Sequence, residues 1–370
     1  MTTHKAHRIV INFLLITSFI YPVFAQKAAP RAVSAGRLLE VKIPSPSLKG
    51  NLLGDPVEQS VAIYLPPGYD TSASKRYPTL YLLHGFGGDS KTWTGKGDFG
   101  FNVLPLLDAM MSDGRIRELI VVAPNGRNAY GGSFYSNSEV TGNWEDYIYR
   151  DLVGYVDAHY RTFARPSSRG IAGHSMGGYG AVILGMKHPE TFSAVYALSP
   201  CCLGLEGDLG ESNSAWLRVL RLTSRDQVPK EPKSFEDFFV TAFVALSAVF
   251  SPNPARAPLY GDWPFVERDG RIQKNDVIYG KWQSKMPLYL VEKYKQNLLS
   301  LRGIFLDYGE KEEFSHIRSS TSSLSKALAE RQIPHVFELY KDGDHGNKVR
   351  ERLETRLFGF FSDKLDFSNP

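Results

Sequence analysis

The chain has 370 residues, of which 42% are hydrophobic and 22% charged, a balance typical of a globular protein with a large core. Its formal net charge is only +4, which argues against a nucleic-acid partner or a membrane-surface partner. The two cysteines, Cys201 and Cys202, are neighbours in the sequence. Adjacent cysteines rarely satisfy disulfide geometry, so we expect two small, buried apolar side chains rather than a covalent cross-link.

Residues 1–25 have the features of a secretory signal peptide. Two basic residues precede an apolar run over residues 9–24, and a small-residue cleavage site ends at Ala25. The alternative is a membrane anchor, but the run is short for a membrane span. Cleavage would remove the two basic residues and lower the net charge from +4 to +2. We therefore expect an exported protein, periplasmic or secreted from a bacterial cell, without stable membrane insertion and with a disordered lead-in over residues 26–36.

The elements that follow alternate between strands and helices. Residues 38–43 and 59–65 alternate apolar and polar side chains, which predicts an antiparallel pair of edge strands. Residues 77–83 and 119–123 are nearly continuous apolar runs, as in strands that are buried on both faces of a parallel sheet. Further strands are predicted at 171–172, 192–198, 303–307 and 336–340, and helices at 101–111, 144–160, 178–187, 315–331 and 348–361. This order predicts an α/β fold with a mostly parallel central sheet and helices on both faces.

The alternation stops between residues 203 and 297. This segment is rich in proline and aromatic residues and has one apolar helical stretch over residues 238–250. A helix of about 13 residues is short for a membrane span, so we favour a core or lid helix over a membrane-contacting one. We therefore expect one domain, made of residues 37–202 and 298–370, with a lid or cap insertion over residues 203–297.

A nucleophile motif lies between the strand that begins at residue 171 and the next helix. The sequence Gly173-His174-Ser175-Met176-Gly177 has the form G-x-S-x-G, in which the serine projects from a sharp turn between a strand and a helix. A serine hydroxyl is a weak nucleophile and needs such exposure, together with a nearby base. The same pattern also fits an ordinary glycine-rich turn. The assignment of Ser175 as a nucleophile therefore depends on the other groups that the chemistry requires.

Those groups follow in the order that this fold uses, which is serine, acid and histidine. His345 lies in the turn after the strand at 336–340, whereas His316 and His335 do not follow a strand. Four carboxylates follow or end the preceding strand: Asp307, Glu310, Glu312 and Glu313. The backbone N–H of Met176, directly after the serine, and that of Phe86, after the strand at 77–83, are placed to bind an oxyanion.

Several segments together resemble the esterase D / S-formylglutathione hydrolase-like branch of the α/β-hydrolases. That branch also includes feruloyl esterases, siderophore esterases and mycolyltransferases. The resemblance covers most of residues 40–200 and 300–361. The segments that carry it are Val61–Tyr69, Tyr77–Gly88, Gly142–Tyr147, Tyr155–Asp157, Tyr160–Thr162, Gly173–Ala181 and Asp342–Gly346.

The resemblance implies an α/β-hydrolase fold, with Ser175 as nucleophile, His345 as base and the N–H groups of Phe86 and Met176 as oxyanion donors. The acid of the family usually occupies a Gly-x-x-Asp-x-Phe segment. Here the sequence is Gly309-Glu310-Lys311-Glu312-Glu313-Phe314, so the matching residue is Glu312. This departure leaves Asp307 as the alternative acid. We expect its side chain to form a local turn or cap instead.

The expected function is that of an exported serine carboxylic-ester hydrolase with an acyl-enzyme intermediate and no metal or organic cofactor. The alternatives are an acyltransferase that passes the acyl group to an alcohol and a catalytically inactive binding protein. Aromatic residues suggest an aromatic or carbohydrate-linked ester as substrate. S-formylglutathione is disfavoured because glutathione chemistry belongs to reducing compartments. The aromatic side chains expected to bind substrate are those of Trp93, Trp144, Tyr260 and Trp263.

Overall fold

A computed structural model of the chain describes residues 1–2, 35–96 and 100–368. Nearly all of the predicted signal peptide and of the predicted lead-in lies outside the described residues. Residues Ser34–Pro370 form one compact unit.

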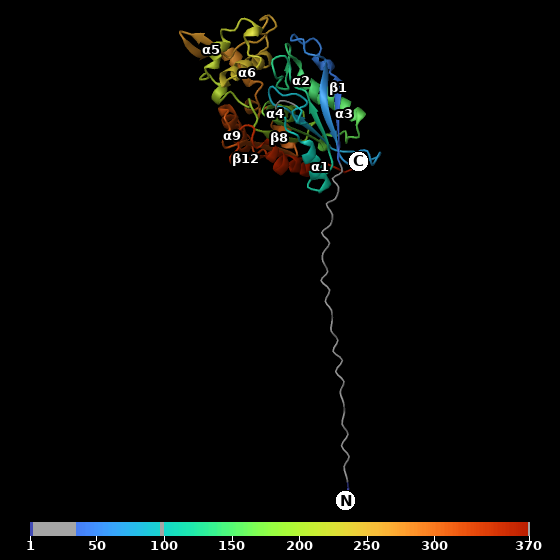
Figure 1. Cartoon of the computed structure of the whole chain (residues 1–370). Coiled ribbons are helices and arrows are strands. Elements are labelled where there is room, and N and C mark those ends of the chain that lie inside the picture. The colour runs from blue at the N-terminus through green and yellow to red at the C-terminus, as the bar shows by residue number, and fades with distance from the viewer. Residues whose placement is uncertain (3–34, 97–99, 369–370) are drawn as a thin grey trace. The chain divides into compact units, whose positions relative to one another are not determined.

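The core of this unit is an eight-stranded sheet with the strand order β1-β2-β4-β3-β7-β8-β11-β12 (Figure 1). The pairs β1–β2 and β2–β4 are antiparallel and the other five are parallel, so the predicted α/β class with a mostly parallel sheet is confirmed. Only β1 of the predicted pair of edge strands lies at an edge, because β2 also pairs with β4. The strands of this sheet are β1 Arg37–Pro44, β2 Glu58–Leu65, β3 Thr79–Leu83, β4 Ile120–Pro124, β7 Arg169–His174, β8 Ala194–Leu198, β11 Gly303–Gly309 and β12 Val336–Tyr340.

The packing of strand β3 explains why its sequence does not alternate between polar and apolar residues. Leu80 and Leu82 pack into the core on one face of the sheet, and Tyr81 and Leu83 pack into the core on the other. All four side chains are fully buried, which a strand in the middle of a parallel sheet requires.

Helices cover both faces of the sheet. Side chains of α1 and α11 belong to the core on one face, and those of α3, α4 and α9 to the core on the other. No helix in the described part of the chain is both long enough and apolar enough to span a bilayer. The helices are α1 Leu104–Ser112, α2 Trp144–Asp146, α3 Val153–His159, α4 Met176–Lys187, α5 Ala215–Val219, α6 Phe235–Phe250, α7 Asp276–Gln283, α8 Lys295–Ser300, α9 Ser315–Glu330, α10 Val349–Arg352 and α11 Phe358–Lys364.

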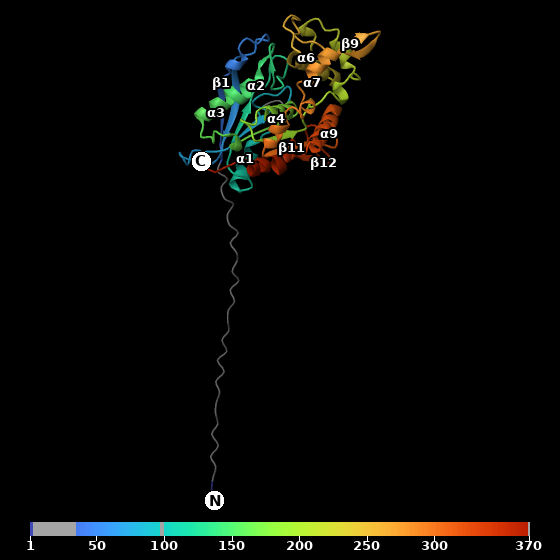
Figure 2. The same ribbon diagram turned by 180° about the vertical axis from the view of Figure 1, so that it is seen from behind.

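Residues 203–297 interrupt the alternation between β8 and β11. They contain α5, α6, α7, the start of α8 and a short hairpin of β9 Phe265–Arg268 and β10 Arg271–Lys274. The two views show α5, α6, α7 and β9 grouped together, well away from β1 and α3 (Figures 1 and 2). Inside this segment the ring of Trp216 stacks on Phe243 of α6, with ring centroids 3.8 Å apart. The apolar stretch predicted over residues 238–250 is thus part of a buried helix, α6, within the segment 203–297.

The loops at the carboxyl ends of the parallel strands carry the residues that the motifs single out. Strand β7 leads into Ser175, β3 into Phe86, β11 into Glu312 and β12 into His345. In open α/β sheets this edge is where ligands bind.

Candidate active site

Ser175 lies in a strained turn between β7 and α4. Its backbone φ is 56° and ψ is −118°, a conformation that non-glycine residues rarely adopt and that is enriched at functional sites. Gly173 and Gly177 allow this turn, because a Cβ atom on Gly173 would overlap the backbone of Gly177. The amide of Ser175 donates a hydrogen bond to Leu198 O at 3.0 Å, which ties the turn to strand β8. The side chain is partly exposed, so its hydroxyl can be reached from the pocket.

His345 and Glu312 meet at the ends of two neighbouring strands. His345 Nδ1 donates a hydrogen bond to Glu312 Oε2 at 2.9 Å, and the Glu312 side chain is fully buried. The second carboxylate oxygen of Glu312 accepts from Phe314 N at 3.2 Å, and the ring of Phe314 packs edge-on against the imidazole of His345. Glu313 Oε2 accepts the backbone N–H of His345 at 2.9 Å. The carboxylate of Glu312 therefore fixes the tautomer and the orientation of the imidazole, which leaves Nε2 free to accept a proton.

His174, inside the G-x-S-x-G motif, joins the serine turn to the histidine loop. Its Nε2 lies 2.7 Å from the carbonyl oxygen of His345, to which it donates. Burial, helped by the nearby His345, lowers the pKa of His174 to about 3, so the ring is neutral. Ser175 and His345 are not hydrogen-bonded to each other in the part of the chain that the structure describes, and catalytic hydrogen bonds of free enzymes often close only with substrate bound.

Asp307, the alternative acid, is engaged elsewhere. It is fully buried on β11, where Oδ2 accepts hydrogen bonds from Arg352 Nε at 2.8 Å, Arg352 Nη2 at 2.7 Å and Tyr196 OH at 2.6 Å. The expectation that its side chain forms a local turn or cap was wrong, because β11 points it into the core toward α10. Among the four carboxylates it is Glu312 that contacts the imidazole of His345.

The loop after β3 brings Phe86 close to the serine. A Cβ atom on Gly85 would lie 3.3 Å from Ser175 Cβ, so the backbone of this loop passes directly beside the nucleophile turn. His84 anchors the loop: Nε2 accepts from Gly126 N at 2.8 Å, and burial lowers the pKa of His84 to about 4. Met176 is the first residue of α4, where the backbone N–H groups have no partner inside the helix. Phe86 and Met176 thus both lie near Ser175, Phe86 in the loop beside the serine turn and Met176 directly after the serine.

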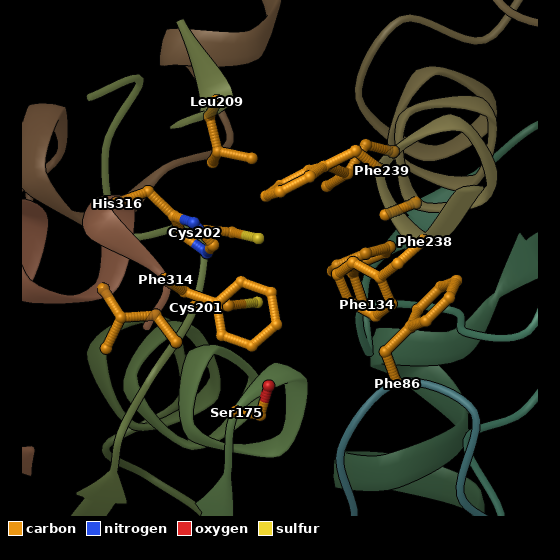
Figure 3. A pocket seen from close by; sticks show the side chains of 13 residues that line it. Phe86, Phe134, Ser175, Cys201, Cys202, Leu209, Phe238, Phe239, Phe314 and His316 are labelled. Carbon is orange, nitrogen blue, oxygen red and sulfur yellow. The ribbon is translucent and has the colours of Figure 1, made fainter. Parts of the chain in front are cut away.

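An apolar pocket opens above Ser175. It contains about 370 Å³ of space not filled by atoms, part of it open to solvent. Figure 3 shows the serine hydroxyl pointing into the pocket, with Phe86, Phe134, Phe238 and Phe239 on one side and Phe314, Cys201, Cys202 and His316 on the other. Helix α6 of the inserted segment supplies much of the aromatic side. The lining residues are Phe86, Phe134, Ser175, Cys201, Cys202, Leu209, Phe238, Phe239, Ala242, Leu246, Phe314, His316 and Ile317.

The four aromatic residues expected to bind substrate lie elsewhere; none of them lines this pocket. Trp93 and Trp144 are buried in the core, and Trp144 Nε1 donates to Thr141 O at 2.7 Å. Trp263 is buried beneath Arg256, whereas Tyr260 lies in a turn with a φ of 57°. These positions give the four side chains packing and turn roles, and the phenylalanines of the pocket are better placed to contact a substrate.

A polar cluster in the pocket wall has no counterpart in the sequence motifs. Cys201 and Cys202 are buried and unpaired, and His316 lies beside them. His316 Nδ1 is hydrogen-bonded to Asp208. Burial opposes the charge on His316, but Asp208 and Cys201 outweigh it and raise the pKa of His316 to about 9. Burial likewise opposes a thiolate, but Cys202 and His316 lower the pKa of Cys201 to about 7. Both cysteines are buried and free, as expected, and the contact between Cys201 and His316 is the feature that the sequence did not reveal.

Comparisons with known proteins agree with the resemblance noted in the sequence. The chain matches the model of the Esterase family over residues 56–352. An esterase of Mycobacterium tuberculosis is 35% identical over 138 residues, which make up 36% of this chain and 27% of that protein. The chain thus spans about a quarter of the length of this curated relative.

Solved structures show the fold. A ferulic acid esterase that is 20% identical superposes with a TM-score of 0.59, covering 90% of this chain and 99% of the other. An S-formylglutathione hydrolase from Staphylococcus aureus that is 17% identical superposes with a TM-score of 0.55, covering 89% of this chain and 100% of the other. The α/β-hydrolase fold implied by the resemblance is confirmed.

Proposed function

The chain belongs to the esterase family, and we propose that it is an exported carboxylic-ester hydrolase whose catalytic triad is Ser175, His345 and Glu312. The observation that carries the proposal is the buried carboxylate of Glu312, 2.9 Å from His345 Nδ1, at the sheet edge where Ser175 occupies a strained turn. A buried carboxylate that orients a histidine next to a serine turn is the arrangement that activates a hydroxyl nucleophile.

In this mechanism Ser175 Oγ attacks the ester carbonyl carbon while His345 Nε2 takes the hydroxyl proton. Glu312 stabilises the imidazolium that forms, without itself becoming protonated. The backbone N–H groups of Phe86 and Met176 donate to the oxyanion of the tetrahedral intermediate. The imidazolium then protonates the leaving alcohol, and the acyl-enzyme remains. A water molecule, deprotonated by His345, releases the acid and restores the serine.

The pocket indicates the class of acyl group. A ring of phenylalanines above Ser175 offers an apolar, aromatic surface, and such rings stack with or pack edge-on against another aromatic group. The similar structure named a ferulic acid esterase agrees with an aromatic acyl group. We therefore place the acyl chain of an aromatic or otherwise bulky ester in this pocket, with residues 203–297 acting as the lid that supplies α6.

The test is labelling with a fluorophosphonate probe, followed by hydrolysis of a panel of esters by the mature protein. We expect labelling at Ser175 and hydrolysis of p-nitrophenyl acetate, with faster turnover of methyl ferulate than of aliphatic methyl esters. Labelling with acyl transfer to an added alcohol, but no net hydrolysis, would identify an acyltransferase instead. A folded protein that neither reacts with the probe nor hydrolyses any ester would contradict the proposal.

A further inference from the structure

Three potential metal ligands converge in the wall of the pocket. The two sulfur atoms of Cys201 and Cys202 and a ring nitrogen of His316 all lie within 4.8 Å of one another. All three residues are buried, and both cysteines are free. The cysteines follow β8, and His316 lies in the first turn of α9, more than a hundred residues further along the chain. The fold thus brings the two neighbouring thiols next to an imidazole that is distant from them in the sequence.

His316 is oriented in the way that metal-binding histidines are. Asp208 holds Nδ1 of the ring, and Asp208 is itself fixed by the backbone N–H groups of Ser315 at 2.9 Å and His316 at 3.0 Å. The other nitrogen, Nε2, is buried and has no hydrogen-bond partner among the described residues. A buried polar atom without a partner is costly, and a carboxylate on the far nitrogen is the usual support of a histidine that binds metal. The orphaned atom is therefore the observation that points to a ligand.

The backbone at Cys202 helps the two sulfurs to converge. Cys202 has a φ of 58°, a left-handed backbone conformation that is unfavourable for residues other than glycine. Successive side chains on extended backbone point to opposite sides, whereas here both sulfurs line one pocket, as Figure 3 shows. Strain of this kind is retained where the arrangement of the residues matters.

We propose that Cys201, Cys202 and His316 bind a zinc ion, and that the bound ion closes the pocket above Ser175. Two thiolates and an imidazole are the ligand types that zinc prefers, and three protein ligands leave a fourth position open. Ideal zinc bond lengths place tetrahedral ligand atoms about 3.6–3.8 Å apart. The present separations are at most 4.8 Å, so binding needs shifts of no more than about 1 Å. Binding releases the thiol protons and the proton on His316 Nε2 to solvent, because only thiolates and a neutral imidazole nitrogen bind the ion.

The ion would regulate the enzyme rather than take part in its chemistry. The three ligands and Ser175 line the same pocket, so an ion held by these ligands would take up part of the space that the acyl group is proposed to fill. This part of the inference rests on the proposed function. Bound zinc is therefore expected to compete with esters that have a bulky acyl group and to inhibit small acetates less.

The first experiment measures binding without any ester. The reduced, untagged mature protein is titrated with Zn²⁺ against a chromogenic chelator, and with Co²⁺ while the thiolate-to-cobalt charge-transfer absorption is recorded. We expect one equivalent of zinc and a charge-transfer band from wild-type protein. Cys202→Ser and His316→Ala should each weaken zinc binding by at least about tenfold. His159→Ala, which changes an exposed histidine on α3, should bind as wild type does.

The second experiment measures inhibition of ester hydrolysis by the same Zn²⁺ titration. Absence of stoichiometric zinc and of the cobalt band in folded wild-type protein would overturn the site, whatever the esterase activity. Binding that survives both substitutions would overturn the ligand assignment. Tight binding without inhibition of bulky-ester hydrolysis would overturn the closure of the pocket, and loss of hydrolysis in metal-free protein would count against the proposed function alone.

Discussion

His174 donates a hydrogen bond from Nε2 to the carbonyl oxygen of His345 across 2.7 Å, so the residue before the nucleophile holds the loop that carries the base. The two rings lie 4.6 Å apart between centroids. Because its pKa is about 3, His174 stays neutral and keeps one N–H to donate at every pH at which the enzyme would work. The serine turn and the histidine loop are therefore coupled by one buried hydrogen bond.

The first prediction concerns this bond. His174→Ala should lower kcat by about two- to tenfold with little change in KM, because a neutral hydrogen bond contributes about 0.5–1.5 kcal/mol. His174→Gln, which keeps an amide donor, should recover part of the loss. The measurements are kcat, KM and the melting temperature of each variant. A purely structural role would instead lower the melting temperature of both variants and leave kcat of the folded fraction unchanged.

Glu312→Gln should lower kcat by about 10⁴-fold while leaving the protein folded, because the histidine would lose the carboxylate that sets its tautomer. Glu310 is exposed and two residues away, so Glu310→Gln is the matched control and should retain near-normal turnover. Turnover of p-nitrophenyl acetate and the circular dichroism spectrum are compared for both. Near-normal activity of Glu312→Gln would show that another group orients His345.

Asp307→Asn should destabilise the protein and leave the chemistry of the folded fraction intact. The substitution removes the buried one of the two carboxylates that pair with Arg352, and Glu338 remains at 2.6 Å. The cost should therefore stay below the about 3–5 kcal/mol that is typical of a buried charge left without any partner. The free energy of unfolding from urea denaturation and the activity per folded molecule are the measurements. An unchanged free energy of unfolding together with lost turnover would assign Asp307 to the active site instead.

Phe238→Ala should reduce kcat/KM for bulky aromatic esters and affect p-nitrophenyl acetate little, since only a large acyl group reaches α6. Loss of one apolar contact in a pocket changes selectivity by about 1–3 kcal/mol, or roughly 10–200-fold. Trp263→Ala is the control, because Trp263 lies in the inserted segment but does not line the pocket. Equal losses on all esters for Phe238→Ala, or a selectivity change for Trp263→Ala, would contradict the proposed location of the acyl group.

Local sequence patterns were enough to predict much of the fold and part of the site. Apolar runs predicted β3 and β4, and glycines on both sides of Ser175 predicted the turn between strand and helix. Because parallel strands end at one edge of a sheet, the turns after β11 and β12 could be expected to bring Glu312 and His345 together. Their contact in the structure agrees with that expectation, and their catalytic roles stay predictions.

The rest of the site depends on contacts between residues that are distant in the sequence. No local pattern shows that Cys201 and His316 share one wall of the pocket or that Asp208 holds His316 there, since helix α9 and the segment after β8 meet only in the folded chain. Aromatic composition also could not show which aromatic residues lie in the core and which line the pocket. Trp144 and Phe238 are both large aromatic residues in helices, and only the packing shows that the second one faces Ser175.

The central claim is that Ser175 is the nucleophile, and the most direct test is turnover by Ser175→Ala. Removing one hydroxyl from a partly exposed turn should leave the melting temperature close to that of the wild type. Because the whole triad acts through this oxygen, hydrolysis of every ester in the panel should fall by about 10⁴-fold or more, and the fluorophosphonate probe should no longer label the protein. Residual turnover within about tenfold of wild type in the folded variant would contradict the account.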